Sequence, residues 1–111
     1  MVNANNPHAR IDAINLALDR ATAAKISARP ELVEIGQANL RRWQARNGGE
    51  FSPAHQEWEL ILRFLTPDEL AEFIVSETPK ANRLRQSSPL AGILTEAERL
   101  AILRANEKAA A

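Results

Sequence analysis

The side chains best suited to chemistry in this sequence lie in the segment HQEWE, from His55 to Glu59. On a helix, His55 and Glu59 would lie one turn apart on the same face, where an imidazole and a carboxylate could bind metal or exchange protons. Zinc peptidases need a second histidine at the position that Glu59 occupies, and the chain contains no cysteine. We therefore expect a hydrogen-bonded surface pair here, no catalytic, metal-binding or cofactor-binding residues, and a protein that is not an enzyme.

Two groups of arginines are the other candidates. The guanidinium group makes paired hydrogen bonds to carboxylates and phosphates, which lysine does not. In the segment RLRQSS, two arginines stand beside an amide and a free serine that folding does not require. We predict a partner-binding surface made of Arg83, Arg85, Gln86 and Ser87, with Arg41 and Arg42 nearby. The alternative is a solvated helix face whose arginines pair with the acidic residues of the middle of the chain.

The elements that would position these side chains are helices. Six prolines stand where a helix could begin, and the residue before each proline would be the N-cap. Five of these six residues are good N-caps, namely Asn6, Ser52, Thr66, Thr78 and Ser88; the sixth is Arg29. Thr66 with Glu69, and Thr95 with Glu98, have the spacing of capping boxes. The sequence therefore predicts an all-α fold, a compact bundle of five to six helices joined by Ser/Thr-Pro corners.

Apolar spacing sets the extent of these helices and their buried faces. We expect helices over residues 8–28, from Pro30 to the glycines at 48 and 49, from Ser52, from Thr66, and over 80–86 and 96–108. Trp43 and Trp58 could meet across an antiparallel helix pair and close one end of the core. The predicted core also contains Ile14, Leu18, Leu40, Ile61, Leu62, Leu65, Phe73, Leu100 and Leu103.

The connection from Gln86 to Leu94 is too long for the turn of a helix-turn-helix motif. The helix after it would also begin with Glu96 and Glu98, which would repel the phosphates of DNA. We instead expect a short turn whose apolar residues fill a gap between helices, with Gly92 allowing the close approach.

Composition limits the class of protein. The 111 residues form one expected domain, 1–111, with frayed tails at 1–5 and 109–111. The polar start and the lack of a long apolar run favour a cytoplasmic protein without membrane segments. Positive and negative charges cancel overall, but residues 51–77 hold six acidic residues and one basic residue. A general nucleic-acid binder usually has a basic excess, so nucleic acid is possible but not favoured as a partner.

The segments ANLRRWQARNGG, HQEWELIL and RLRQSSPLAGILTEAERLAIL together resemble a group of small, all-helical bacterial proteins described as antitoxins or regulators. The resemblance covers residues 8 to 104, and its most particular part is the run from Arg83 to Leu94 followed by TEAER. It implies binding to a protein partner, with no catalytic residue to carry over.

Two functions follow as expectations. The first is a non-catalytic bacterial interaction module, antitoxin-like, that binds and restrains a protein partner. The second is a small DNA-binding transcriptional regulator that uses the arginine groups. A homodimer is compatible with either. The C-terminal EKAAA resembles a signal for proteolysis, but a frayed helix end rich in a good helix former is the favoured explanation.

Overall fold

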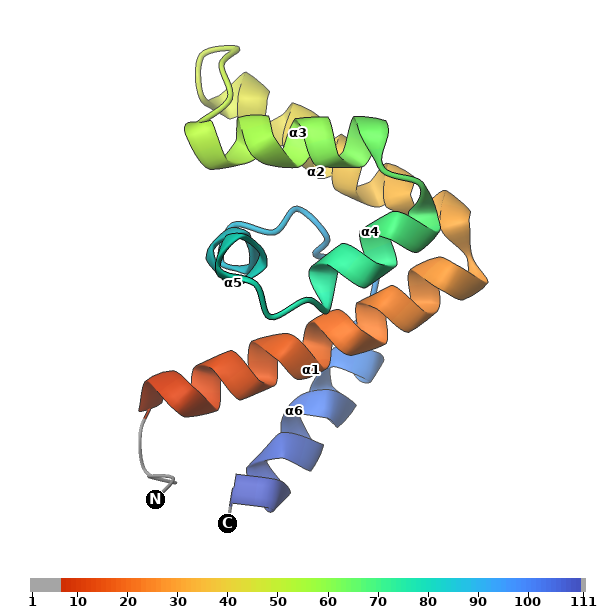
Figure 1. Ribbon diagram of the computed structural model, residues 1–111, viewed down its shortest axis with the longest axis vertical. Coiled ribbons are helices and arrows are strands. Elements are labelled where there is room, and N and C mark those ends of the chain that lie inside the picture. The colour runs from red at the N-terminus through yellow and green to blue at the C-terminus, as the bar shows by residue number, and fades with distance from the viewer. Residues whose placement is uncertain (1–6, 111) are drawn as a thin grey trace.

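The computed structural model describes residues 7–110, with side chains to residue 107, and this part of the chain contains helices and no strand (Figure 1). The all-α expectation is therefore confirmed. The elements are α1 (Pro7–Ala28), a 3-10 turn η1 (Pro30–Leu32), α2 (Val33–Arg46), α3 (Pro53–Phe64), α4 (Pro67–Ile74), α5 (Pro79–Arg85) and α6 (Glu96–Ala110). The expected frayed residues 1–5 and 111 lie outside the described residues, whereas Ala109 and Ala110 continue α6.

Hydroxyl caps start most of these helices, as the sequence indicates. Ser52 and Thr78 each accept a hydrogen bond from the main-chain N–H three residues later. Thr66 and Thr95 form complete capping boxes with Glu69 and Glu98, since each hydroxyl and each carboxylate accepts a main-chain N–H. Arg29 precedes η1 without a side-chain cap, and Ser88 precedes a turn rather than a helix.

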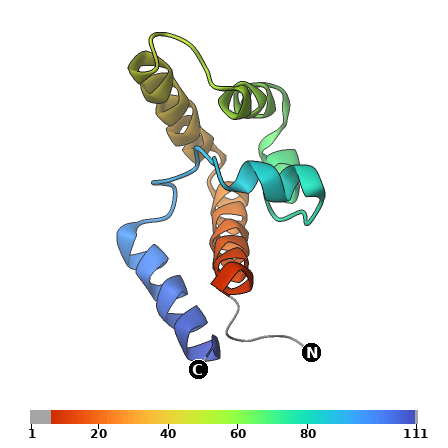
Figure 2. The same cartoon turned by 90° about the vertical axis from the view of Figure 1, so that its left-hand side faces the viewer.

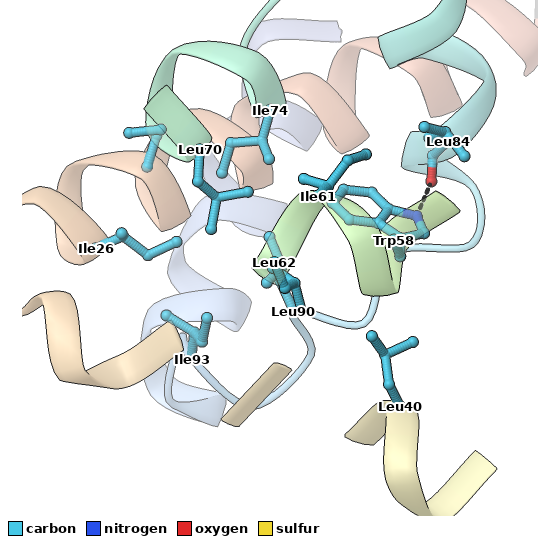
Figure 3. Packing of buried hydrophobic residues seen from close by; sticks show 12 residues of the cluster. Ile26, Leu40, Trp58, Ile61, Leu62, Leu70, Ile74, Leu84, Leu90 and Ile93 are labelled. Atoms are coloured by element: carbon cyan, nitrogen blue, oxygen red, sulfur yellow. Dashed lines mark hydrogen bonds between the residues drawn. The ribbon is translucent and has the colours of Figure 1, made fainter. Parts of the chain in front are cut away.

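The core lies where α2, α3, α4 and α5 meet the second half of α1. Trp58 is buried in this core: the indole Nε1 donates to the carbonyl of Leu84 at 2.9 Å (Figure 3). Its ring meets Phe73 edge-on, with 6.0 Å between the ring centroids. The other buried apolar residues of this core are Ala23, Ile26, Leu40, Ile61, Leu62, Leu70, Ala71, Ile74, Leu84, Leu90 and Ile93.

Part of the predicted core is more exposed than expected. Leu65 and Phe73 are half-buried against the core, as is Trp43, which stacks on His55 at 4.8 Å rather than pairing with Trp58. Ile14, Leu18 and Leu103 are also only half-buried, and Leu100 is exposed. The reason is that the first half of α1 and the whole of α6 extend beyond the core, and that α6 packs mainly on α1 alone (Figure 2).

The turn between α5 and α6 fills a gap, as predicted. Leu90 and Ile93 are buried, and Gly92 has a φ of 97°, a conformation that favours glycine. Gly36 of α2 makes the close approach possible, because a Cβ there would lie 3.0 Å from the side chain of Leu90 and 3.2 Å from that of Leu62. Asn39 holds the turn by donating to the carbonyls of Pro89 at 2.7 Å and Ala91 at 2.8 Å.

The described chain measures 43 × 28 × 24 Å along its principal axes. Its long dimension comes from α1 and α6, whose outer ends extend beyond the core on the same side (Figure 2). Within residues 7–110, none of the helices combines the length and the apolar character required to cross a bilayer.

Candidate functional site

The end of α5 borders a polar hollow of about 510 Å³ against the first half of α1. Helix α5 contributes Asn82, Arg83 and Gln86 to this hollow, and Arg85 forms part of its wall. Facing them are Asp12 and Asn15 from α1 and Glu77 from the segment before α5. The hollow thus gathers three of the residues that the sequence assigns to partner binding, together with two carboxylates that the sequence analysis did not assign to this site.

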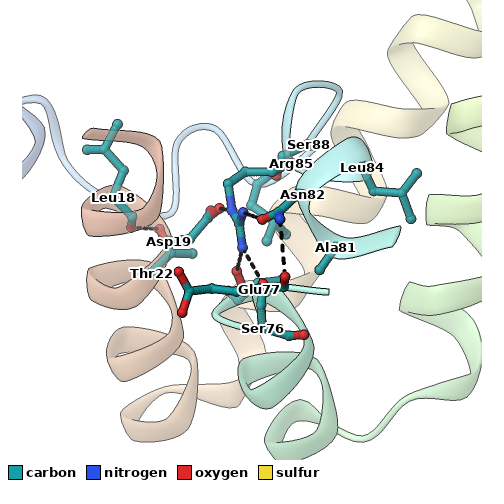
Figure 4. A network of polar contacts seen from close by, with 12 residues as sticks. Leu18, Asp19, Thr22, Ser76, Glu77, Ala81, Asn82, Leu84, Arg85 and Ser88 are labelled. Atoms are coloured by element: carbon teal, nitrogen blue, oxygen red, sulfur yellow. Dashed lines mark hydrogen bonds and ion pairs between the residues drawn. The ribbon is translucent and has the colours of Figure 1, made fainter. Parts of the chain in front are cut away.

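Arg85 forms part of the wall of this hollow and is largely buried, whereas the sequence analysis predicts it on an exposed partner-binding surface. Its guanidinium group bonds the Asp19 carboxylate at 2.6 Å, the Asn82 amide oxygen at 2.5 Å, and the main-chain carbonyls of Ile74 at 2.9 Å and Ser76 at 2.7 Å (Figure 4). Only 10% of its side chain is accessible to solvent. These contacts join α1, the end of α4 and α5, so Arg85 holds the fold together and positions its neighbours.

Asp19 is the counter-ion of Arg85, and its surroundings are unusual for a carboxylate. Burial raises the pKa of Asp19 from 3.8 to about 6, although the hydrogen bond and the charge of Arg85 both act to lower it. The Asp19 carboxylate therefore titrates closer to neutral pH than an ordinary aspartate does.

A second hollow, of about 620 Å³, adjoins the same ion pair. One side of this hollow is lined by Asn15, Asp19 and Arg85. The other side comes from the turn before α6, with Leu94 and Thr95, and from the first turns of α6, with Arg99. Most of its remaining lining is apolar and comes from Leu18, Leu90, Ala91 and Gly92. Because Arg85 and Asn15 line both hollows, the Arg85–Asp19 pair lies next to each of them.

Arg83 and Gln86 are the residues of the predicted segment that reach solvent. Arg83 is 56% exposed and makes an ion pair with Glu57 of α3 at 2.9 Å, without the alignment of a hydrogen bond. Gln86 is an exposed residue that ends α5. The Ser87 hydroxyl is turned inward and donates to the carbonyl of Leu84 at 3.2 Å. The acidic middle of the chain thus pairs with one arginine of α5, as the alternative reading of this segment expects.

The second arginine group lies at a different hollow. Arg41 lines a space of about 530 Å³ between α2 and α3, together with Gln44, Phe51 and Arg63. Arg42 donates to the side-chain oxygen of Asn39, and so orients the amide that holds the turn after α5. Arg42 therefore has a structural contact in addition to its exposed position.

The HQEWE segment lies on α3, where its two candidate side chains have separate partners. His55 stacks on Trp43, with 29° between the ring planes, and Glu59 makes an ion pair with Arg63 one turn later. The predicted His55–Glu59 pair is replaced by these contacts, each of which serves the packing or the surface of α3.

Sequence reasoning missed Asp19 and Asn39. Asp12, Asn15 and Asp19 follow one another at three-residue and four-residue spacing, so they form a polar stripe beside the apolar stripe of α1. Asn39 interrupts the apolar face of α2 between Gly36 and Leu40. A polar residue in an apolar stripe indicates a buried hydrogen bond, and this signal could have found Asn39.

Comparison of this chain with protein-family models, curated proteins and solved structures gave no match.

Proposed function

We propose that this chain is a non-catalytic interaction module of the bacterial cytoplasm, which binds and restrains a partner protein through the polar hollow between α1 and α5. The observation that supports it is the position of Arg83 and Gln86, two exposed side chains at the border of a hollow whose wall is held by the Arg85 network. A side chain on a rigid support loses little more than its own rotamer freedom on binding.

The charges around the hollow favour a protein partner. Asp12 and Glu77 line it together with Arg83, so it presents both signs of charge within one space. A protein segment that carries a carboxylate for Arg83 and a basic side chain for Asp12 or Glu77 would match this pattern. A nucleic-acid backbone offers phosphates only, and the two carboxylates would oppose it.

The test is capture of partners from the native cell extract with the tagged protein, followed by mass spectrometry. Arg83→Ala combined with Gln86→Ala should abolish capture, while thermal stability stays within about 1 kcal/mol, as is usual for exposed residues. Arg29→Ala is the matched control, because Arg29 is also an exposed arginine with one acidic partner, Glu31.

An unchanged set of captured proteins would overturn the proposal. A DNA mobility shift at low salt that disappears as salt is raised, and that requires Arg83, would instead support the regulator.

A further inference from the structure

Helix α3 exposes two large apolar side chains on the face opposite its buried one. Leu60 is 51% exposed and Phe64 is 72% exposed, and the two lie one turn apart. The same helix buries Trp58, Ile61 and Leu62, so its core-facing stripe is already complete without them. Single exposed apolar residues are common, but two that form a stripe on one helix suggest a contact surface.

Helix α4 adds carboxylates that the described part of the chain does not neutralise. Of the six acidic residues between 51 and 77, Glu57 and Glu59 pair with arginines and Glu69 completes a capping box. Asp68 and Glu72 are exposed, lie one turn apart, and make no ion pair with the side chains of residues 7–107. The helix dipole accounts for Asp68 in the first turn but not for Glu72 in the second.

Helices α3 and α4, which carry the apolar pair and the two carboxylates, lie on the same side of the molecule. Figures 1 and 2 place α3 and α4 on one side, with α2 and α1 behind them. The buried face of α3 meets α2, since the side chain of Leu62 approaches Gly36, and α4 packs along α1. The exposed faces therefore both point away from those partners, and only Leu65 and Thr66 separate α3 from α4.

We propose that this surface, Leu60, Phe64, Asp68 and Glu72, binds an amphipathic helix of a partner protein that carries lysines or arginines beside its apolar face. The apolar stripe would remove Phe64 and Leu60 from water, and the carboxylates would select a basic partner. A second copy of this chain, placed by a two-fold axis, would offer the carboxylates only the same four side chains, none of which is basic. None of these four residues lines the hollow between α1 and α5, so the two proposals can be tested with different variants.

The first test uses a synthetic amphipathic helix of leucine and lysine as the probe, with the full chain and fluorescence anisotropy as the readout. Phe64→Ser with Leu60→Ser should weaken binding at least about tenfold, because hot-spot apolar residues dominate such contacts. Ile11→Ser is the matched control, since Ile11 is 54% exposed but lies on α1. Thermal melts should show that all these variants remain folded.

The second test concerns charge. Asp68→Asn with Glu72→Gln should weaken binding of the leucine–lysine peptide, whereas Glu50→Gln, at an exposed carboxylate before α3, should not. A leucine–glutamate peptide should bind at least about tenfold more weakly than the basic one. Equal binding of the two peptides, insensitivity to Phe64, or a dimer that Phe64→Ser dissociates would overturn the proposal. Gln86→Ala should bind the basic peptide like the unchanged protein, which separates this surface from the proposed function; Arg83 is left in place here because it pairs with Glu57 of α3.

Discussion

The positively charged guanidinium group of Arg85 lies where α1, α4 and α5 meet, and oxygen atoms from these parts of the chain surround it. One carboxylate, one side-chain amide and two main-chain carbonyls accept its hydrogen bonds. The carbonyl of Ile74 belongs to the last residue of α4, where a helix leaves main-chain oxygens without partners, and that of Ser76 lies two residues further on. The guanidinium group therefore also acts as a C-terminal cap of α4. Arg85 is therefore suited to holding its neighbours in place. It is poorly suited to binding a partner itself, because it would have to break these internal hydrogen bonds.

The raised pKa of Asp19 predicts a pH dependence of stability. In the folded protein this carboxyl binds its proton up to about pH 6, whereas the ordinary value is 3.8, so the folded state binds more protons between these limits. Its contribution to the free energy of unfolding is therefore largest below pH 3.8 and is lost as pH rises through 6. We expect a loss of about 1–2 kcal/mol over this window, measured by urea unfolding at several pH values.

Asp19→Asn is the control for this prediction. The quantity compared is the slope of the free energy of unfolding against pH, not its value at one pH. The variant is neutral at every pH, like the protonated carboxyl that it replaces, so its stability should show a flatter dependence between pH 4.5 and 6. Parallel curves for the two proteins would contradict the assignment. Glu98 acts at lower pH with the opposite sign: the Lys25 hydrogen bond lowers its pKa to about 2, so its contribution is lost as pH falls below 4.5.

At the scale of elements, the turn between α5 and α6 depends on one side chain of α2. Asn39 donates both of its amide hydrogens to carbonyls of this turn, and its oxygen accepts from Arg42. Asn39→Asp keeps the shape of the side chain but replaces the donating NH₂ group by an oxygen, which would face the carbonyls of Pro89 and Ala91. We expect a loss of about 3 kcal/mol in the free energy of unfolding, measured by urea denaturation, because a buried charge would then face acceptors.

Asn39→Ala serves as the comparison and should cost less, about 1–3 kcal/mol, since it leaves two carbonyls unpaired but adds no charge. If aspartate at position 39 proved as stable as asparagine, the hydrogen bonds to Pro89 and Ala91 would not be formed as described.

The helices could be predicted because their signals are local. Ser52, Thr66, Thr78 and Thr95 cap helices within three residues of themselves, and each acts as the sequence indicates. The pairing of Arg85 with Asp19 spans 66 positions and that of Asn39 with Pro89 spans 50. Such contacts depend on how helices are placed in space, which periodicity along one helix does not determine. The sequence therefore predicts correctly that Arg83 and Gln86 lie on the surface, but it does not predict that Arg85 is turned inward to Asp19.

At the scale of the whole molecule, the same limit explains the over-predicted core. Ile14, Leu18, Leu100 and Leu103 lie on apolar stripes, and a stripe shows which face would be buried if a neighbour covered it. In this fold α1 and α6 cover each other only in part, so these side chains remain half-buried or exposed. The radius of gyration of 14.6 Å exceeds the roughly 13 Å typical of a domain of this size, in keeping with the extended pair of helices.

The weak attachment of α6 has a consequence for how the protein opens. From Glu96 to Glu107 no side chain is fully buried, and the contact of α6 with α1 includes the Lys25–Glu98 ion pair at 2.6 Å. Amide hydrogens of α6 should therefore exchange with solvent through local opening, at least about tenfold faster than those of α3, as measured by hydrogen–deuterium exchange. Lys25→Ala should speed exchange in α6 and leave α3 unchanged; equal protection of the two helices would show that they open as one cooperative unit. Because Glu96 and Arg99 of α6 line the 620 Å³ hollow, each such opening would also remove one side of it, so the hollow is complete only while this helix lies against α1.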